Sequence, residues 1–574
     1  MKGEMDPMRL EILWTRLTSM VDEAATALVR TAFSAIVRDA NDYGCALFDA
    51  EYNLLAQSTF GTPGFLGALP IAMKIIGRTF PPEMLRPGDV LIANDPWICT
   101  GHLNDITVVT PIYFRGRPVA YSTCTAHEMD IGGRIAIAET REVFEEGLFI
   151  PILKLYEEGH ANETLFKMIR ANVRVPDYVI GDLRAQLAAN DVMASRLCRL
   201  LEEYNMEDVQ ELSCEIISRT EATVRRNISQ LPEGTYSREV MIDKFDEKPI
   251  TIAIAVKLKD GEVVIDYTGS SPQISRGVNV CFNYTRSYTT FAVKCAVSPL
   301  VPNNEGGLRP IKVIAPEGSI LNARFPAPVN SRTNVGQFLP EIVFGTLAPL
   351  TPDRVIAGCG GAPIWAARFT GQLQTGRQFM IFCVSRGGLG ARPTCDGVST
   401  LAFPSNTVAT PVEIVEGDAP VIYEKKELIQ DSAGAGKYRG GFGQHVVVRV
   451  LDGDLAPASH VIASVKGGRL HYPVPGLLGG KDAPKGVINV DGETFQISGQ
   501  QVILKPGSYV ELLTPGGGGY GDPMDRDPAL VEEDIRNGLV STQAAKTDYG
   551  VVTDERGWKV DREATRKVRA VKGG

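Results

Sequence analysis

The chain has 574 residues, of which 44% are apolar and 22% are charged, and its formal net charge is −9. These proportions are typical of a globular protein and exclude a disordered, collagen-like or coiled-coil chain. The negative charge argues against nucleic acid or an anionic membrane surface as a partner. At about 100 to 200 residues per domain, the length predicts three or four structural units.

The cysteines and the N-terminal segment indicate the compartment. The ten cysteines form no CxxC pair, which fits neither a disulfide scaffold nor a zinc ribbon and indicates reduced thiols. The first residues lack a basic and apolar leader, and no uncharged apolar stretch of about 18 residues occurs. We therefore expect a cytoplasmic protein that does not cross a membrane.

The N-terminal segments, 1–160, are expected to form an α+β region. Apolar residues at helical spacing over 7–38, after Asp6 and Pro7, predict a long amphipathic helix. Two short strands follow over 43–58, and a Gly/Pro-rich loop then leads into a helix near 71–80.

The rest of this region predicts strands. A buried strand is expected at 89–95. The segments 106–114 and 119–127 flank a tight turn with the sequence Arg-Gly-Arg-Pro and therefore predict a β-hairpin.

The remaining chain divides into three parts. Residues 161–232 are charged and helically periodic, which predicts a helical layer. Strand patterns dominate 233–524, where Asp260-Gly261 has the composition of a hairpin turn, and 525–574 predict a polar tail with a short helix. The expected fold class is α+β, with an N-terminal α+β unit, a helical layer and a β-rich C-terminal half.

Three glycine clusters lie in the β-rich part, at 434–443, 476–480 and 515–523. None contains the GxxxxGK[ST] phosphate loop, and none has a G-x-G-x-x-G fingerprint between a strand and a helix. Turns are the favoured interpretation, and no nucleotide site is expected on this chain.

The predicted hairpin brings chemistry-bearing residues together. In a hairpin that turns about Gly116, Asp105 lies opposite His127, and His102 is three residues before Asp105. Two imidazoles and a carboxylate suit Zn²⁺, Mn²⁺ or Fe²⁺. A fourth ligand could come from Asp39, Asp42 or Asp95, and spacing alone does not choose between them.

Plain structural roles are the alternative for these residues. Asp105 could cap a turn, and His127 could be a buried histidine whose hydrogen bonds are satisfied within the core. Cys99 and Cys124 lie in the same region, but without a partner pattern they are more readily buried small residues than nucleophiles.

Many segments along the chain occur in a familiar order. They include RTAFSAIVRDANDYGCALFDA, LRPGDVLIANDPW, GHLNDITVVTPIYFRGRP, AHEMDIGG, EEGLFIPILKL, DYTGSSPQ and PGGGGYGDPMDRDP. Together they resemble the hydantoinase B family, which also covers the B part of 5-oxoprolinase and the metal-bearing subunits of acetone and acetophenone carboxylases. The resemblance runs over nearly the whole chain.

The resemblance implies an enzyme with two kinds of subunit. A hydantoinase A-type partner with an actin-like ATPase fold would bind ATP-Mg and activate the substrate, and this chain would hold one divalent metal, most readily zinc. The family pattern carries the metal ligands onto Asp42, His102, Asp105 and His127, which selects Asp42 over Asp39 and Asp95.

The expected function is that of the B-type subunit of an ATP-dependent amidohydrolase, which opens a hydantoin, an oxoproline or a lactam within a hetero-oligomer. Glu128 or Asp130 could act as the base. The alternative is a ketone carboxylase subunit of the acetone or acetophenone type, and a scaffold without a metal is disfavoured.

Three segments depart from the family pattern. The loop FGTPGFLGALP replaces a histidine-bearing loop of hydantoin-type relatives with Phe60, Phe65 and Leu66, and Glu128 stands where a second histidine is usual. Thr333, after Arg332, also replaces a histidine found in many members. An apolar wall predicts a less polar lactam in preference to 5-oxoproline, unless the loop lies on a subunit interface.

Overall fold

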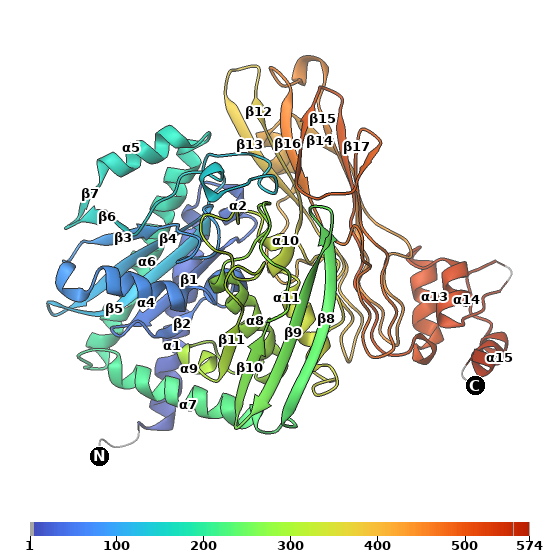
Figure 1. Cartoon of the computed structure of the whole chain (residues 1–574), viewed down its shortest axis with the longest axis horizontal. Helices are drawn as coiled ribbons and strands as arrows, with labels where there is room; N and C mark the ends of the chain where they lie inside the picture. Colours follow the sequence, from blue (N-terminus) through green and yellow to red (C-terminus); the bar gives the residue numbers. More distant parts are fainter. Residues whose placement is uncertain (1–4, 555, 573–574) are drawn as a thin grey trace.

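The computed structural model describes residues 5–554 and 556–572. Figure 1 shows an N-terminal sheet with its helices in blue to cyan, a second sheet with helices in green, strand layers in yellow to orange, and helices at the C-terminal end in red. This arrangement confirms the α+β class. No helix within the described ranges is long and apolar enough to cross a membrane.

The first sheet has seven strands in the order β2-β1-β5-β4-β3-β6-β7, and neighbouring strands are antiparallel. Side chains alternate between its faces, so that Cys45 and Leu47 enter one core while Ala46 and Phe48 enter another. The strands are β1 (Tyr43–Asp49), β2 (Leu54–Gln57), β3 (Val90–Ala93), β4 (Asp105–Phe114), β5 (Arg117–His127), β6 (Leu153–Glu157) and β7 (His160–Ala161).

The long helix predicted over 7–38 is interrupted. Asp6 caps α1 (Pro7–Thr31) by accepting the Arg9 N–H, as expected, but α1 ends before a short second helix, α2 (Ala35–Arg38). The break is held by a distant residue, because the carboxylate of Asp182 accepts the N–H groups of Phe33 and Ser34. The helix expected near 71–80 is α4 (Leu69–Thr79), which follows the single turn α3 (Pro63–Leu66).

The helical layer is present as α5 (Glu163–Asn172), α6 (Pro176–Glu203) and α7 (Gln210–Ile228). It shares a core with the first sheet, because α6 packs on α1 and on strands β4 and β5. Gln186 and Asn190, one helical turn apart on α6, donate to the carbonyls of Ile106 and Val108 on β4. These contacts fix the strand that begins at Asp105.

The second sheet has four strands in the order β11-β10-β9-β8, with helices against it. Asp260 and Gly261, at φ 51° and 69°, form the predicted turn between β9 and β10. The region expected to be β-rich therefore begins with a mixed unit. Its elements are β8 (Gly234–Lys244), β9 (Pro249–Lys259), β10 (Glu262–Asp266), α8 (Phe282–Val297), α9 (Glu305–Leu308), β11 (Ile311–Ile314), α10 (Thr333–Gly336) and α11 (Leu339–Leu347).

Two further sheets share one hydrophobic core. Their strand orders are β13-β12-β16-β19 and β14-β15-β20-β17-β18. The elements are β12 (Trp365–Gln372), β13 (Gln378–Ser385), α12 (Val412–Asp418), β14 (Val421–Leu428), β15 (Gln444–Val450), β16 (Val461–Lys466), β17 (Val487–Val490), β18 (Glu493–Phe495), β19 (Gln500–Leu504) and β20 (Tyr509–Leu513).

The glycine clusters at 434–443 and 515–523 are not simple turns, so for them that prediction was wrong, whereas the cluster at 476–480 contains a turn closed by the Gly480 N–H on the Leu477 carbonyl. The segments around Gly434, Gly441 and Gly517 lie side by side and exchange backbone hydrogen bonds. A β-carbon on Gly440 would lie 1.8 Å from the Gly517 carbonyl oxygen. Glycine is required here because neighbouring backbones approach too closely for any side chain.

The C-terminal tail also differs from its prediction, which was one short helix. It contains α13 (Pro528–Arg536), α14 (Thr542–Tyr549) and α15 (Arg562–Lys572). Buried Arg526 anchors this part by pairing with Asp396 and Asp534.

Candidate metal centre

The hairpin β4–β5 places Asp105 and His127 opposite each other, as predicted. Arg115 and Gly116 form its turn, with φ 50° and 82°. A β-bulge between Ile112 and Tyr113 shifts the pairing by one residue, and beyond it the register continues to the Asp105–His127 pair. Both side chains therefore lie at the open end of the hairpin.

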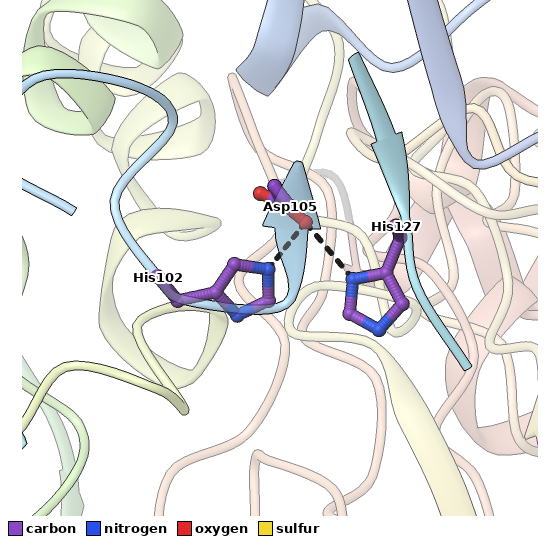
Figure 2. Close-up of side chains that lie close together, drawn as sticks. All are labelled: His102, Asp105 and His127. Carbon is purple, nitrogen blue, oxygen red and sulfur yellow. Dashed lines mark hydrogen bonds and ion pairs between the residues drawn. The ribbon is translucent and has the colours of Figure 1, made fainter. Parts of the chain in front are cut away.

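His102, Asp105 and His127 form a compact cluster (Figure 2). Oδ1 of Asp105 lies 2.5 Å from Nε2 of His102 and 3.0 Å from Nδ1 of His127. One possible ligand atom from each residue lies within 4.8 Å of the other two. All three side chains are buried.

The orientation of His102 makes it a suitable ligand. Its Nδ1 lies 3.1 Å from both the backbone carbonyl and the side-chain oxygen of Asn330, and we assign the ring proton to this nitrogen because it faces two acceptors. Burial, followed by the charge of Arg332, lowers the pKa of His102 to about 3, and the ring is neutral near neutral pH. The lone pair of Nε2 therefore faces a carboxylate oxygen, an arrangement that a bound cation would satisfy.

Asp105 is held in its ionised form. Its Oδ2 accepts hydrogen bonds of 2.6 Å from Thr100 Oγ1 and from Nη2 of Arg332. Burial alone would raise the pKa of Asp105, but the interactions of its carboxylate with His102 and with the Arg332 guanidinium hold it well below its usual range. Arg332 is itself fixed by the Thr100 carbonyl, at 2.8 Å, and by the Tyr284 ring, 4.1 Å from its Cζ.

Asp42 lies at the same end of the sheet, just before β1 and beside β5. Its carbonyl accepts the His127 N–H at 3.0 Å, and its Oδ1 accepts from Thr62 Oγ1 at 2.8 Å. Burial raises its pKa, while the charge of His127 lowers it. Asp42 lines the same cavity as both histidines, although it is outside the compact cluster of three. Its role as fourth ligand stays a prediction.

Neither Asp39 nor Asp95 lines this cavity. Asp39 pairs with Arg38 at 2.8 Å, and the Oδ1 of Asp95 accepts the Trp97 N–H at 2.9 Å. Among the three aspartates left open by spacing, the cavity therefore includes only Asp42.

The structure does not bring Glu128 and Asp130 to the cavity. Glu128 is fully buried, its two carboxyl oxygens have no hydrogen-bond partner among the described residues, and burial followed by the charge of Asp182 raises its pKa well above the usual range. The Oδ1 of Asp130 accepts from Arg174 at 2.8 Å and from the Gly132 N–H at 3.1 Å. A base role for either residue stays a prediction.

The cavity around the cluster measures about 40 Å³ and has an apolar side formed by Phe65 and Phe382. Of the predicted apolar loop, Phe65 lines the cavity, but Phe60 is 67% exposed. The prediction for the Leu66 side chain falls outside what the structure describes.

Cys99 and Cys124, the two cysteines near the cluster, are buried, as expected if they are small core residues and not nucleophiles. Burial raises the pKa of Cys99 to about 12 and that of Cys124 well above its usual range. Neither thiol is thus ionised as a nucleophile requires.

Sequence reasoning missed the residues that the C-terminal sheets contribute. Arg368 on β12 and Lys466 on β16 line the cavity, as do Ser405 and Thr407. No local motif marks these residues, since each comes from an ordinary strand or loop more than two hundred positions after the hairpin.

A family model described as hydantoinase B/oxoprolinase matches residues 6–523. The chain belongs to this family. It is 30% identical to the B component of a putative D-/L-hydantoinase from a Pseudomonas strain, over 99% of this chain and 98% of the relative. It is 31% identical to the beta chain of the caprolactamase of Pseudomonas jessenii, over 99% of each.

Two solved structures have the same fold as this chain. The crystal structure of the ATP-dependent caprolactamase from Pseudomonas jessenii superposes with a TM-score of 0.90, at 29% identity, over 99% of this chain and 100% of the other. A nucleotide-free acetone carboxylase chain superposes with a TM-score of 0.89 over 99% of this chain and 83% of the other. At 20% identity, that second likeness concerns the fold alone. The chain is a hydantoinase B-type subunit, as its sequence motifs predicted.

Proposed function

We propose that this chain is the metal-binding B-type subunit of an ATP-dependent amidohydrolase that opens a cyclic amide such as a hydantoin, an oxoproline or a lactam. The observation that carries the proposal is the cluster of His102, Asp105 and His127, in which a neutral imidazole nitrogen faces a carboxylate oxygen. Its relatives include components of a hydantoinase and of a caprolactamase.

The donor set fits one divalent metal, with Zn²⁺ favoured and Mn²⁺ or Fe²⁺ possible as alternatives. His102, Asp105 and His127 would hold it, with Asp42 as the fourth ligand. When bound, such a metal polarises a carbonyl and lowers the pKa of water toward about 7.

The chain's own residues prepare the site in three ways. Asn330 keeps the His102 proton on Nδ1, which leaves Nε2 free to bind a cation. Arg332 keeps Asp105 ionised. Phe65 and Phe382 contribute apolar surface to the cavity lining, and the exclusion of water there strengthens the electrostatic interactions inside it.

Opening an unstrained amide requires activation, because the amide is a poor electrophile. We propose that ATP-Mg is bound by a hydantoinase A-type ATPase partner, which transfers a phosphoryl group to the amide oxygen and so makes the ring carbon more electrophilic. Water then adds to this carbon, the ring C–N bond breaks with the nitrogen leaving as the amine, and phosphate is released by hydrolysis. The sequence supports this division of labour, since it contains no phosphate loop.

The ring of the substrate needs more room than the cavity at the cluster provides. Phe382 also lines a larger cavity of about 470 Å³, which includes Met129, Tyr178 and Met380. We place the ring there, with its reacting carbonyl directed past Phe382. The apolar residues support the expected preference for a lactam over 5-oxoproline.

A ketone carboxylase subunit is the second candidate function. The specific observation in its favour is the fold shared with acetone carboxylase. A dependence of turnover on bicarbonate, with a keto acid as product, would favour this candidate.

The test is reconstitution with an A-type partner. The assembled enzyme should open a lactam ring when ATP is supplied, lose turnover after chelation, and regain it when Zn²⁺, Mn²⁺ or Fe²⁺ is returned. Turnover that survives complete removal of metal contradicts the proposal, and ring opening that requires bicarbonate redirects it to the carboxylase.

A further inference from the structure

Two buried cations on the C-terminal sheet face the cavity of the candidate metal centre. Arg368 on β12 pairs with Phe382 on β13, and Lys466 on β16 lies diagonally across from Arg368. Residues paired across neighbouring strands point to the same face of a sheet, so the three side chains share one face. The Arg368 Cζ and the Lys466 Nζ lie 5.5 and 5.8 Å from the centre of the Phe382 ring.

Neither cation has an anionic partner among the described residues. Within that part of the chain, the Lys466 ammonium donates to Thr333 Oγ1 at 3.2 Å and forms no ion pair, and the Arg368 guanidinium forms neither an ion pair nor a hydrogen bond. Asp130 acts on Arg368 electrostatically, but its carboxylate is already bound to Arg174. Burial, and then the charges of Arg368 and Arg332, lowers the pKa of Lys466 to about 7.

Three other buried arginines meet carboxylates, whereas buried Arg386 donates to Thr407 Oγ1 at 3.0 Å and forms no ion pair among the described residues. Arg332 pairs with Asp105, Arg469 with Glu341, and Arg526 with Asp396 and Asp534. Burying a cation without a partner is costly, which is why such pairing is the rule in proteins. Arg368, Lys466 and Arg386 therefore lack the carboxylate that the other three arginines have, and the hydrogen-bond partner of Arg386, Thr407, lines the same cavity as the first two.

The cavity has the size and the donors for a small oxyanion. Its 40 Å³ has room for about three water-sized groups. The hydroxyls of Thr333, Ser405 and Thr407 line it with the two cations. Of the two carboxylates near it, Asp105 is engaged by Arg332, and Asp42 acts on both Lys466 and Arg386, so the cations outnumber the carboxylates left to offset them.

We propose that Arg368 and Lys466, with the hydroxyl of Thr333, form an oxyanion subsite beside the candidate metal centre. The subsite binds the charged oxygens of the ligand, either the phosphoryl group of an activated amide or a carboxylate on the substrate. The identity of that ligand rests on the proposed function, whereas the anion binding itself needs neither the metal nor the partner chain.

The test is calorimetric titration of the full-length, metal-free chain with inorganic phosphate and, separately, with 5-oxoproline. Arg368→Met and Lys466→Met should each weaken anion binding at least about tenfold, since hydrogen bonds to charged groups are the strong ones. Arg368→Lys, which keeps the charge, should weaken it less. Lys426→Met is the control, because Lys426 lies 5.3 Å from the centre of the Tyr423 ring but does not line the cavity.

Stability gives a second readout. A subsite built for an anion leaves its cations uncompensated when empty, so both methionine variants should unfold at or above the wild-type temperature. A structural role for these cations predicts a lower temperature instead.

The two anions distinguish the source of the oxyanion. Phosphate binding that depends on Arg368 and Lys466 indicates the phosphoryl group, and 5-oxoproline binding with that dependence indicates a substrate carboxylate. The proposal is overturned if neither anion binds the wild-type chain, or if both bind the two methionine variants as well as wild type. Because metal and ATP are omitted, a failure here is separate from a failure of the proposed amidohydrolase function.

Discussion

Replacing Arg332 by Met tests how the candidate metal ligand Asp105 is kept ionised. Arg332 makes three interactions at once, with the Asp105 carboxylate at 2.6 Å, the Thr100 carbonyl at 2.8 Å, and the Tyr284 ring at 4.1 Å. Methionine retains much of the side-chain volume and removes the charge. The variant leaves Asp105 as a buried carboxylate without its cation.

Arg332→Met should lower both the folding free energy and the affinity for metal. Removing one partner of a buried ion pair costs about 3 to 5 kcal/mol of folding free energy. Removing a residue that orients and ionises a metal ligand weakens metal binding about 10- to 100-fold. At a metal concentration far above the dissociation constant, a 100-fold weaker site also loses about 2.7 kcal/mol of metal-dependent stabilisation.

Arg469→Met is a closely matched control. Arg469 is buried, pairs with Glu341, donates to the Ala362 carbonyl at 3.2 Å and lies 4.4 Å from the Phe338 ring centre, all away from the cavity. Thermal unfolding is measured with chelator and with excess metal. Both variants should be destabilised in chelator, but only Arg332→Met should show a smaller stabilisation by metal. Equal metal-dependent shifts in the two variants would refute this reasoning.

Four further predictions concern three single side chains and the isolated chain. Burial raises the pKa of Glu146 to about 8, although the Asn330 N–H opposes this shift. The pKa of an unfolded Glu is about 4.3, so wild-type stability falls as pH rises from this value to the folded pKa, while the stability of Glu146→Gln does not. In denaturant unfolding, the free energy of unfolding of the variant minus that of wild type should therefore rise by about 1.4 kcal/mol per pH unit over this range. A difference that does not change with pH contradicts the raised pKa. Glu128→Gln should keep turnover near wild type because its carboxyl is outside the cavity, whereas a loss of about 100-fold or more at unchanged stability would support the predicted base role. Phe65→His should raise kcat/KM for 5-oxoproline relative to that for a plain lactam, and Phe60→His is the exposed control. The lactam prediction is wrong if Phe65→His leaves the ranking of the two substrates unchanged, or if the wild-type enzyme already prefers 5-oxoproline. The isolated chain should hydrolyse ATP far more slowly than the assembled enzyme in the presence of a cyclic amide, and equal rates would contradict the assignment of ATP to the partner.

Local patterns were sufficient to predict the centre of the site. A tight turn between two strand-forming runs predicts a hairpin whose open end brings Asp105 close to His127. The observed turn at Arg115 and Gly116 alone would place Asp105 opposite Ala126, and the bulge at Ile112, which was not visible in the sequence, shifts the register by one residue to the predicted pair. Asp42 needed the family resemblance, because its position depends on which strand lies beside β5.

Tertiary contacts decided what the sequence could not predict. The predicted single helix breaks where Asp182, from a distant helix, captures the N–H groups of Phe33 and Ser34. The glycine clusters pack backbone against backbone from separate segments, which no local turn pattern reveals. Arg368 and Lys466 reach the cavity from ordinary-looking strands of another sheet, so nothing near them in the sequence marks their place.

The metal content of the purified chain tests the central claim most directly. Wild type and His460→Ala should each carry one equivalent of Zn²⁺, Mn²⁺ or Fe²⁺, since His460 is exposed and outside the cluster. His102→Ala and His127→Ala should each lose most of the metal, and their unfolding temperatures should fall with it because binding is coupled to the folded state. A full metal equivalent and full turnover in both cluster variants would contradict the account.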